Sequence, residues 1–596
     1  MLDSNKKNHM DFLYTNSNSE SRSMTDSLAS ALRQRPSVFH ELAGDWGSLA
    51  ISVEATKCNT LSTRNHLVIL IGTPVSYRTN GTEGLVTKTD IAAIAQGVLS
   101  GASRWMSTLS GPFAILIIDP RKMTLTIATD PLAFIPVYVS NYSDQLVVST
   151  HVDAAANAKS SVSRDRTSIA DFILHGIVTY PYTLYEDIQQ VPPGSITTID
   201  LNNVRRISSK HYWLPMARNP YSDVAEAAQS LREGTLRFLR AAVQTETNTA
   251  QFLSGGEDSR VLAGLLTSFG DKNPVALTYV DTPNRESQIA TKVAQAYGLE
   301  HQVIKRHPQH YIQHLSGATA NVGSVSQFIQ AHSYGIQTDP KLESYGAIFG
   351  GWSADAFLKA MYARQTTGPY GFPVYPHRLL AGETRTSPII HELFSQERLA
   401  EVRQRRVDHM NRVLEFRTDS CHEWFMLWPA SMRATSGQFH SNRRLFRSIE
   451  PFISHEVLRL SASVPTSWKM GRRLFHEAFR EFLEPSKWIP HASGYYPYRL
   501  SPFNAIVSLP RWMCDGAMRA ALRYGLRNSA VASWSNWHGV MRSERWKAAV
   551  LQASKGYKFL PIVSSEDEGG DLLNDRSLSV HQKLNALQVA TFFAEG

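Results

Sequence analysis

Short apolar runs separated by turn residues dominate the first third of the chain. Each run is rich in aliphatic or β-branched residues, and Gly, Pro, Asn, Asp or Ser stands nearby, which is typical of β-strands. The clearest runs are Leu67–Ile71, Phe113–Asp119, Leu125–Ala128, Val137–Ser140 and Ser195–Ile199. This pattern predicts a β-rich region from about residue 44 to residue 205.

A different pattern begins near residue 222, where helical periodicity alternates with strands such as Val275–Val280. Such alternation indicates a parallel sheet with helices on its faces. After about residue 360 the pattern is almost wholly helical. Near the end, Val580, Leu584 and Leu587 recur at helical spacing, which predicts an amphipathic helix that docks back on the protein.

The hydropathy pattern divides the chain into three parts. Residues 1–40 are rich in Ser, Asn and Thr and show little periodicity, so we predict a flexible leader. Residues 41–210 and 211–596 then form two domains. A chain of 596 residues, of which 42% are hydrophobic, has more material than one core usually organises.

Composition excludes several classes of protein. No apolar run approaches the roughly 20 residues of a membrane span, and the N-terminus does not resemble a secretory signal. Cys58, Cys421 and Cys514 lie far apart, so neither a disulfide framework nor a zinc site is indicated. We therefore expect a cytoplasmic protein with no membrane span.

The net charge of +9 is modest for this length, but arginines cluster locally. Arg443, Arg444 and Arg447 form one cluster and Arg472 with Arg473 another, where arginine could meet phosphate. No interleaved aromatic motif of an RNA-binding module accompanies them, so we predict no nucleic-acid partner.

The segment Gln251–Arg260 carries the strongest chemical signal. Its sequence, Gln-Phe-Leu-Ser-Gly-Gly-Glu-Asp-Ser-Arg, ends an apolar strand and leads into a helical pattern. Adjacent glycines with hydroxyls on both sides are typical of a loop whose N–H groups bind a polyanion at a helix N-terminus. The alternative is an ordinary strand-to-helix turn, for which two glycines suffice.

Asp258 distinguishes this loop from other phosphate-binding loops. A Walker loop has Lys-Ser or Lys-Thr after its last glycine, and a dinucleotide fingerprint has differently spaced glycines; neither is present. A carboxylate here would repel phosphate unless a cation lay between them. The loop therefore predicts ATP with Mg²⁺ as its ligand.

Five motifs follow one another in the order found in asparagine synthetases. Ser110–Ala114, Ala128–Tyr138 and Gln190–Gly194 resemble the amino-terminal glutaminase-type domain of that family. Phe349–Asp355 resembles its second magnesium motif, and Ser448–Ser454 resembles a segment that usually reads Arg-x-Pro-Phe-Leu-Asp. Between these groups, the glycine loop resembles the pyrophosphate loop of enzymes that split ATP between its α and β phosphates. The likeness covers roughly residues 44 to 500.

This resemblance implies a fold and a set of site residues. The fold is an α+β, Ntn-type glutaminase-like β-sandwich domain, followed by an α/β synthetase domain of the adenine-nucleotide α-hydrolase-like (PP-loop) class with a helical C-terminal extension. Asp258 and Asp355 would hold magnesium, and Arg472 would face pyrophosphate or the developing oxyanion. The residues implied around the nucleotide are Phe252, Leu253, Ser254, Gly255, Gly256, Ser259, Tyr279, Glu286, Gly350 and Gly351.

Three departures from the family bear on function. The family's glutaminases use an N-terminal cysteine, but this chain has Leu2 there and about 40 further residues in front; Cys58 fits a small buried hydrophobe better than a nucleophile. Trp352 replaces a Glu of asparagine synthetases or a Tyr of β-lactam synthetases and accepts no proton. Arg472 replaces a lysine and cannot shuttle protons; Lys469 is the next candidate for the catalytic cation.

Relatives that use an amine already present in the substrate also lack the ammonia source and keep the ATP-binding motifs. The chain resembles two such groups: β-lactam synthetases and, more closely, the macrolactam-forming cyclases of lasso peptide biosynthesis. The likeness implies adenylation of a side-chain carboxylate in a precursor peptide and attack by the peptide's N-terminal amine. A leader-peptide protease is a candidate partner.

Three alternatives stay open. The first is an asparagine-synthetase-like or β-lactam-synthetase-like ligase that acts on a small carboxylate with free ammonia or an internal amine. The second is a nucleotide-activating RNA-modifying enzyme, for which we find neither a thiol carrier nor an RNA-binding module. The third is a catalytically inactive interaction protein.

Overall fold

The computed structural model covers the chain with several gaps. It describes residues 11–17, 24–33, 39–52, 60–63, 65–78, 81–101, 103–142, 144–159, 161–244, 248–270, 273–336, 342, 344–363, 366–367, 373–374, 394–491, 496–497, 535–560, 573 and 578–595. Cys58 and Cys514 lie outside these residues.

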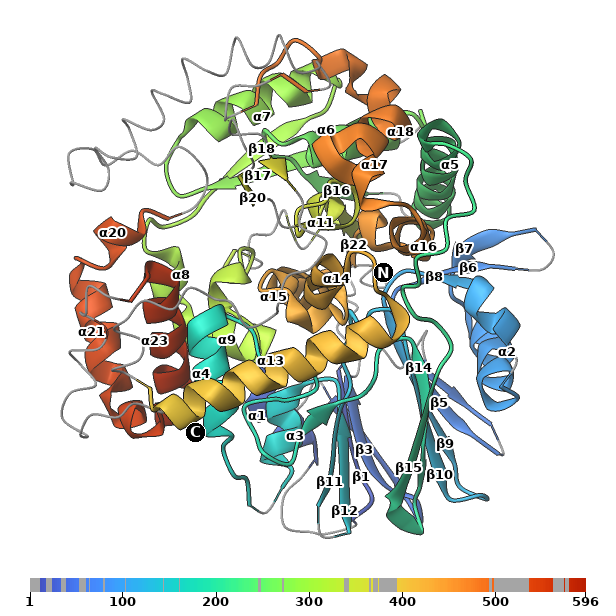
Figure 1. The fold of residues 1–596 in the computed structure, drawn as a ribbon, viewed down its shortest axis with the longest axis vertical. Coiled ribbons are helices and arrows are strands. Elements are labelled where there is room, and N and C mark those ends of the chain that lie inside the picture. Colours follow the sequence, from blue (N-terminus) through green and yellow to red (C-terminus); the bar gives the residue numbers. More distant parts are fainter. Residues whose placement is uncertain are drawn as a thin grey trace.

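Two antiparallel sheets stand face to face at the start of the chain (Figure 1). The strands of the first are β1 (Phe12–Thr15), β2 (Phe39–Gly44), β3 (Gly47–Ser52), β11 (Tyr138–Tyr142), β12 (Gln145–Ser149) and β13 (Gln189–Gln190). Those of the second are β4 (Thr60–Ser62), β5 (Leu67–Gly72), β9 (Phe113–Asp119), β10 (Thr124–Thr129), β14 (Ser195–Asp200) and β15 (Asn203–His211). Their orders are β13-β11-β12-β1-β3-β2 and β15-β14-β10-β9-β5-β4. The strands predicted from the apolar runs are thus confirmed.

Strand β9 shows why the apolar runs are continuous. Ala114, Leu116 and Ile118 point into the core between the two sheets. The alternate residues, which include Ile115 and Ile117, pack on the opposite face beneath helix α2 (Lys88–Leu99). Both faces of the strand are buried, so its sequence shows no polar alternation. A small sheet of β6 (Val75–Tyr77), β7 (Glu83–Leu85) and β8 (Leu109–Ser110) lies beside it.

The predicted flexible leader is wrong for the part of residues 1–40 that the structure describes. Strand β1 lies inside the first sheet, paired with β12 on one side and β3 on the other. Phe12, Leu13 and Tyr14 are all fully buried. Helix α1 (Met24–Leu32) packs against β3 and helix α3 (Val152–Asn157). The Ser- and Asn-rich surroundings of β1 concealed this short apolar strand.

A five-stranded parallel sheet forms the second half of the architecture. Its strands are β16 (Thr249–Phe252), β17 (Val275–Val280), β18 (His301–Lys305), β19 (Ala347–Phe349) and β22 (Ser448–Ile449). The order is β18-β17-β16-β19-β22, with every pair parallel. The chain builds outward from β16 to β18 and then crosses to β19 on the other side of β16. The crevice between the carboxyl ends of β16 and β19 is therefore the switch point where ligands bind in such sheets.

Helices cover this sheet and continue to the end of the chain (Figure 1). Those associated with the sheet are α5 (Val224–Val243), α6 (Glu257–Thr267), α7 (Arg285–Ala296), α11 (Ala354–Leu358) and α18 (Arg473–Leu483). The others are α4 (Arg166–His175), α8 (His310–Gln313), α9 (Leu315–Val322), α13 (Gln396–Phe416), α14 (Cys421–Leu427), α15 (Ser436–Leu445), α16 (His455–Ser463), α17 (Thr466–Lys469), α20 (Trp537–Val540), α21 (Glu544–Gln552) and α23 (Val580–Glu595). None of the helices in the described residues is long and apolar enough to cross a membrane.

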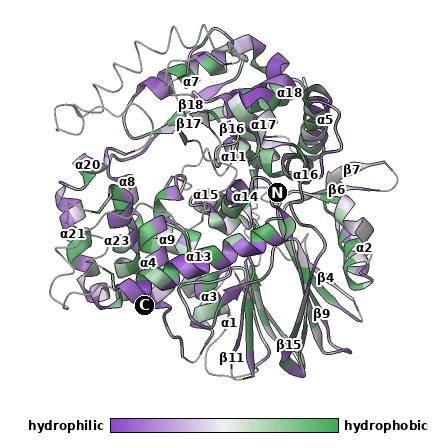
Figure 2. Ribbon diagram, in the orientation of Figure 1, coloured by the Kyte–Doolittle hydropathy of each residue, from purple (hydrophilic) through white to green (hydrophobic). Residues whose placement is uncertain are grey.

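Helix α23 docks back on the protein, as its spacing predicted. Leu584 and Leu587 are fully buried, and α23 packs against α4 and α9. Asn585 donates to the carbonyl oxygen of Phe172 in α4 at 3.1 Å. Figure 2 shows that α13, by contrast, consists mostly of hydrophilic residues along its length.

Buried charges join the two halves of the molecule. Asp11, just before β1, accepts hydrogen bonds from Arg443 at 2.7 Å and from Arg444 at 2.8 Å. Burial alone would raise the pKa of the Asp11 carboxyl, but the two guanidinium groups hold it well below its ordinary value. The suggestion that these two arginines meet phosphate is therefore wrong, because both bind Asp11 inside the protein.

Candidate active site

The loop between β16 and α6 is closed by its own hydroxyls. The backbone N–H of Ser254 donates to Ser259 Oγ at 3.1 Å, and the N–H of Gly256 donates to Ser254 Oγ at 3.1 Å. Ser259 Oγ in turn lies 3.1 Å from the carbonyl oxygen of Ser254 and from that of Gly256. These bonds hold the loop in shape and place it at the positive N-terminus of α6.

The second motif lies directly beside this loop, because β16 and β19 are neighbours. A Cβ atom on Gly350 would collide with the buried carboxylate of Glu450, and one on Gly351 would lie 3.2 Å from the backbone of Asp258. A Cβ atom therefore has no room at Gly350, whereas at Gly351 the neighbouring atoms would have to shift by a few tenths of an ångström. The resemblance places both glycines beside the nucleotide, but at Gly350 the space next to the Cα atom is filled by the Glu450 carboxylate.

The two predicted magnesium ligands converge on one point. Asp258 accepts a short hydrogen bond from the ammonium group of Lys359, and Asp355 Oδ1 lies 2.9 Å from the same nitrogen. Glu257 Oε2 is 3.5 Å from that nitrogen. Burial, reinforced by Asp355 and opposed by Lys359, raises the pKa of Asp258 to about 7.

The residues around this point fit magnesium. Two carboxylates that already meet at one cation position supply the oxygen ligands that Mg²⁺ prefers. Among the described residues, no group of three or more His, Cys, Asp or Glu side chains forms a ready-made metal site. Magnesium typically completes its coordination with water and substrate phosphates, so two protein carboxylates suffice. Asp258 and Asp355 are the residues that would hold it.

Glu257, which lies in the same loop, gathers basic side chains around the site. Its Oε2 lies 2.9 Å from Arg472 Nη1, and its Oε1 lies 3.2 Å from His476 Nε2 and 3.8 Å from His491 Nε2. Burial would raise the pKa of Glu257, but the bond from His476 and the charges of Lys359 and Arg472 outweigh it and lower the pKa. Glu257 is therefore a buried anion that positions cations.

Arg472 reaches the site from the start of α18. Its backbone is left-handed, with φ of 65°, directly after the left-handed Gly471. This turn directs the guanidinium to Glu257 and leaves about a third of the side chain exposed. Lys469, the alternative cation, is instead completely buried against Glu423 at 2.6 Å, away from the loop.

A cavity of about 370 Å³ opens over the two motifs. Ten of the predicted residues line it: Phe252, Leu253, Ser254, Gly256, Asp258, Ser259, Tyr279, Glu286, Gly351 and Asp355. Gly255, Gly350 and Arg472 do not. Gly255 faces away, and its carbonyl oxygen accepts a hydrogen bond from the fully buried Arg260 at 2.9 Å.

The opposite wall of the cavity contains residues that the sequence did not reveal. The phenol oxygen of Tyr311, Oη, lies 3.2 Å from Arg306 Nη1 and 2.8 Å from His332 Nδ1. The phenol oxygen accepts a hydrogen bond from the Arg306 guanidinium, so the phenol O–H can donate to His332. Burial and the nearby Arg306 lower the pKa of His332 to about 3, and its ring stays neutral. These residues belong to no motif, so only the fold brings them to the site.

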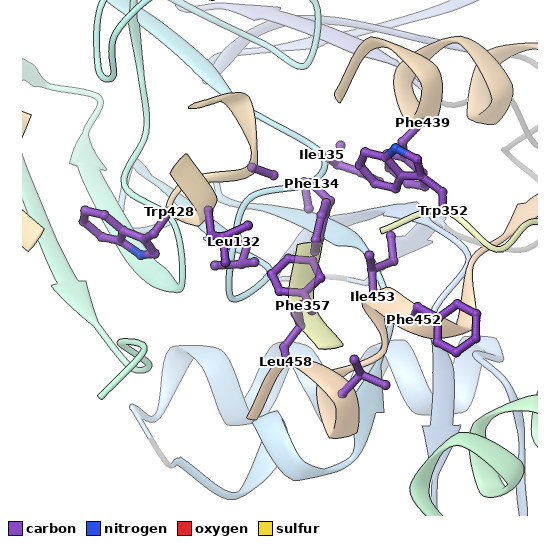
Figure 3. Close-up of a cluster of buried hydrophobic side chains, with 14 of the residues drawn as sticks. Leu132, Phe134, Ile135, Trp352, Phe357, Trp428, Phe439, Phe452, Ile453 and Leu458 are labelled. Atoms are coloured by element: carbon purple, nitrogen blue, oxygen red, sulfur yellow. The ribbon is translucent and has the colours of Figure 1, made fainter. Parts of the chain in front are cut away.

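Trp352 closes the floor of the cavity. Its ring stacks on Phe439, with centroids 5.9 Å apart, and meets Phe134 of the first half edge-on at 6.0 Å. Figure 3 shows these rings within one packed apolar cluster that also contains Ile135 and Phe357. Aromatic side chains thus pack between Trp352, which lines the cavity, and the first half of the molecule.

Two family models match the chain, one in each half. Residues 77–213 match a glutamine amidotransferase domain, and residues 231–334 match asparagine synthase. In these two regions the chain is similar to proteins of the asparagine synthetase superfamily. Its amidotransferase-like part is the sheet-rich first half, and its synthase-like part carries the parallel sheet.

The individual relatives are distant from this chain. Asparagine synthetase [glutamine-hydrolyzing] 1 of Bacillus subtilis is 22% identical over 41% of this chain and 40% of its own length. A putative asparagine synthetase of Methanocaldococcus jannaschii is 21% identical over 27% of this chain and 32% of its own length. The chain thus matches well under half the length of these relatives. A solved structure of the allosteric regulatory enzyme of purine biosynthesis covers 50% of this chain and 75% of its own, at 11% identity and a TM-score of 0.22.

Proposed function

We propose that the chain is an ATP-dependent carbon–nitrogen ligase that releases AMP and pyrophosphate. The observation that carries the proposal is the convergence of Asp258 and Asp355 beside the Ser254–Ser259 loop, at the switch point of a parallel sheet. The loop would act as a pyrophosphate loop. Bound magnesium would neutralise phosphate oxygens and polarise the α phosphate for attack.

The chain's own groups would stabilise the leaving pyrophosphate. The N-terminus of α6 and the loop N–H groups supply fixed positive dipoles. Arg472, held by Glu257, keeps a full positive charge next to the loop. Preorganised charges of this kind act mainly on the transition state, because they need no reorganisation as the negative charge develops.

We further propose that the acceptor is an amine already present in the substrate. Ammonia released in the β-sandwich would have to cross the cluster of Trp352, Phe134 and Phe439. In addition, Asp11, just before β1, forms buried ion pairs with Arg443 and Arg444, which fasten the first half to the second. Both features favour a structural role for the first half of the molecule.

The proposed substrate is a precursor peptide, as in lasso peptide macrolactam synthetases. A side-chain carboxylate would attack the α phosphate, forming an acyl-adenylate and releasing pyrophosphate. The peptide's N-terminal amine would then attack the acyl carbon, lose a proton and expel AMP, which leaves an isopeptide bond. The main contribution of the protein to the rate would be to orient the peptide's amine and carboxylate. In well-oriented intramolecular reactions this lowers the activation barrier by on the order of 7 to 11 kcal/mol. A leader-peptide protease is the proposed partner.

A second candidate is supported by the relatives, which are all named asparagine synthetases. In that case the substrate would be a small carboxylate such as aspartate, and the nitrogen would come from free ammonia or an internal amine.

ATP labelled at the α or γ phosphate distinguishes these functions. The purified protein is supplied with a peptide encoded by a short reading frame next to its gene, or with aspartate and ammonium chloride. Labelled AMP with the peptide, together with loss of one water from its mass, supports the macrolactam ligase. AMP formed only with aspartate supports the second candidate. ADP, or no turnover with any carboxylate, contradicts both.

A further inference from the structure

Lys359 is held in place by more than the two aspartates. It follows α11 directly and lies four residues after Asp355, so both side chains share one helix face. Its side chain is only 6% exposed, and its ammonium lies 4.3 Å above the ring of Phe475 and 3.5 Å from Glu257. These contacts fix a full positive charge at the point where Asp258 and Asp355 meet.

The local charges nearly cancel without any metal. When Asp258 is ionised, Glu257, Asp258 and Asp355 supply three negative charges, and Lys359 and Arg472 supply two positive charges, which leaves a net charge of minus one. An ammonium group and a divalent cation cannot share one position, because they repel each other strongly at such distances. A metal that binds both aspartates must therefore displace Lys359.

We propose that Lys359 is a resident counter-ion that keeps free divalent metal out of the site and yields its place only when metal and nucleotide arrive together. This inference rests on the proposed function, which supplies the nucleotide. The phosphates would give the displaced ammonium a new anionic partner, whereas free metal offers it none. Metal and nucleotide would then strengthen each other's binding, and linkage makes this coupling reciprocal.

Binding of Mn²⁺ without nucleotide tests the proposal. Free Mn²⁺ is counted by electron paramagnetic resonance with the wild type and with Lys359→Met. We expect weak binding by the wild type and at least about tenfold tighter binding by Lys359→Met, because the two aspartates are then unpaired. The gain should disappear in the double variant Lys359→Met with Asp355→Asn. Equal affinities in wild type and Lys359→Met, or tight metal binding by the wild type alone, would overturn the proposal.

Thermal unfolding provides a second measurement. In EDTA, Lys359→Met should melt below the wild type, and Mn²⁺ should restore much of the loss by binding the folded state. Lys469→Met is the matched control, since Lys469 is also buried against a carboxylate, that of Glu423, and no second carboxylate in the described part of the chain pairs with it; Mn²⁺ should not rescue it. Equal rescue of both variants contradicts the proposal. Lys359→Gln, neutral and of similar reach, is measured in parallel in case the methionine variant does not fold.

These readouts need neither ATP nor a peptide. If Lys359→Met gains Mn²⁺ affinity but the wild type forms no AMP with any carboxylate, the counter-ion role of Lys359 is supported and the proposed ligase is refuted. If the wild type forms AMP but Lys359→Met gains no Mn²⁺ affinity, the ligase is supported and the counter-ion role is refuted.

Discussion

The guanidinium of Arg472 forms an ion pair with the buried carboxylate of Glu257, with 2.9 Å between Nη1 and Oε2. Glu257 belongs to the glycine loop, whereas Arg472 begins a helix more than two hundred residues later in the chain. The pair therefore ties α18 to the loop and fixes a positive charge beside the cavity. This arrangement makes Arg472 the strongest candidate for stabilising the leaving pyrophosphate.

Arg472→Ala should lower turnover by about two to three decades, the usual effect of removing one such donor from the transition state. The affinity for ATP should change far less, because the charge acts mainly on the developing anion. Measurement of kcat together with ATP binding checks both parts. Arg472→Lys should recover part of the rate, since charge is kept while the planar fork is lost.

Arg473 is the control for this experiment. It is the next residue on the helix, but it is exposed. Arg473 begins α18, whereas Arg472 precedes the helix with a left-handed backbone, and it is Arg472 that pairs with Glu257. A normal Arg472→Ala variant combined with an inactive Arg473→Ala variant would refute the assignment.

Asp258→Ala and Asp355→Ala should each abolish AMP formation, because each removes an anionic oxygen from the cation position. Asp355→Ala should leave the melting temperature almost unchanged, since its side chain is 56% exposed. Glu484→Ala, which removes an exposed carboxylate paired with Lys487 outside the cavity, should retain full turnover. More than a few per cent of wild-type turnover in either aspartate variant would rule out that residue as a metal ligand.

The purified protein should release no glutamate from glutamine. The family's glutaminases use an N-terminal cysteine, where this chain has Leu2, and Asp11, just before β1, is bound by two arginines. Cys58→Ala should therefore change nothing that a glutaminase assay detects. Glutamate release by the wild type that is lost in Cys58→Ala would return the chain to the ordinary glutamine-dependent synthetases.

Stability should fall on acidification below about pH 6.5, in part through His409. This residue is fully buried among aromatic rings, and burial lowers its pKa to about 3. The unfolded state therefore takes up a proton near pH 6.5 that the folded state refuses until about pH 3. Each such histidine costs about 1.4 kcal/mol of unfolding free energy per pH unit within that window.

His409→Gln isolates this contribution, since glutamine does not titrate. Denaturant unfolding at pH 7.5 and at pH 5.5 should show a smaller loss of stability in the variant than in the wild type, by about 1.4 kcal/mol. Equal losses in both proteins would mean that His409 is protonated in the folded state.

The sequence revealed much of the fold because its strands are buried on both faces and read as continuous apolar runs. Phe113–Asp119 and Val275–Val280 were predicted with the bounds that the structure gives them. Strand β1 was missed because three apolar residues in a polar surrounding are too few to show a period. Its burial is decided by β3 and β12, which lie far away in the chain.

The residues of the candidate site likewise fall into those that local sequence motifs indicate and those that only the fold brings together. Asp258 and Asp355 stand in local motifs, so the sequence indicated them, and the structure brings them to one point. Lys359 had a signal that was overlooked, since it lies one helical turn after Asp355. Tyr311 and His332 had none, because only the packing of distant segments turns them toward the cavity.

The most direct test of the proposed ligase follows one oxygen atom. A peptide encoded next to the gene is prepared with heavy oxygen in its side-chain carboxylates and incubated with ATP, Mg²⁺ and the protein. If a carboxylate attacks the α phosphate and an amine then displaces AMP, one heavy oxygen appears in the AMP, the other stays in the new amide, and the mass of the peptide falls by that of one labelled water. Heavy oxygen in inorganic phosphate alongside ADP, or AMP that carries no label, would contradict the account.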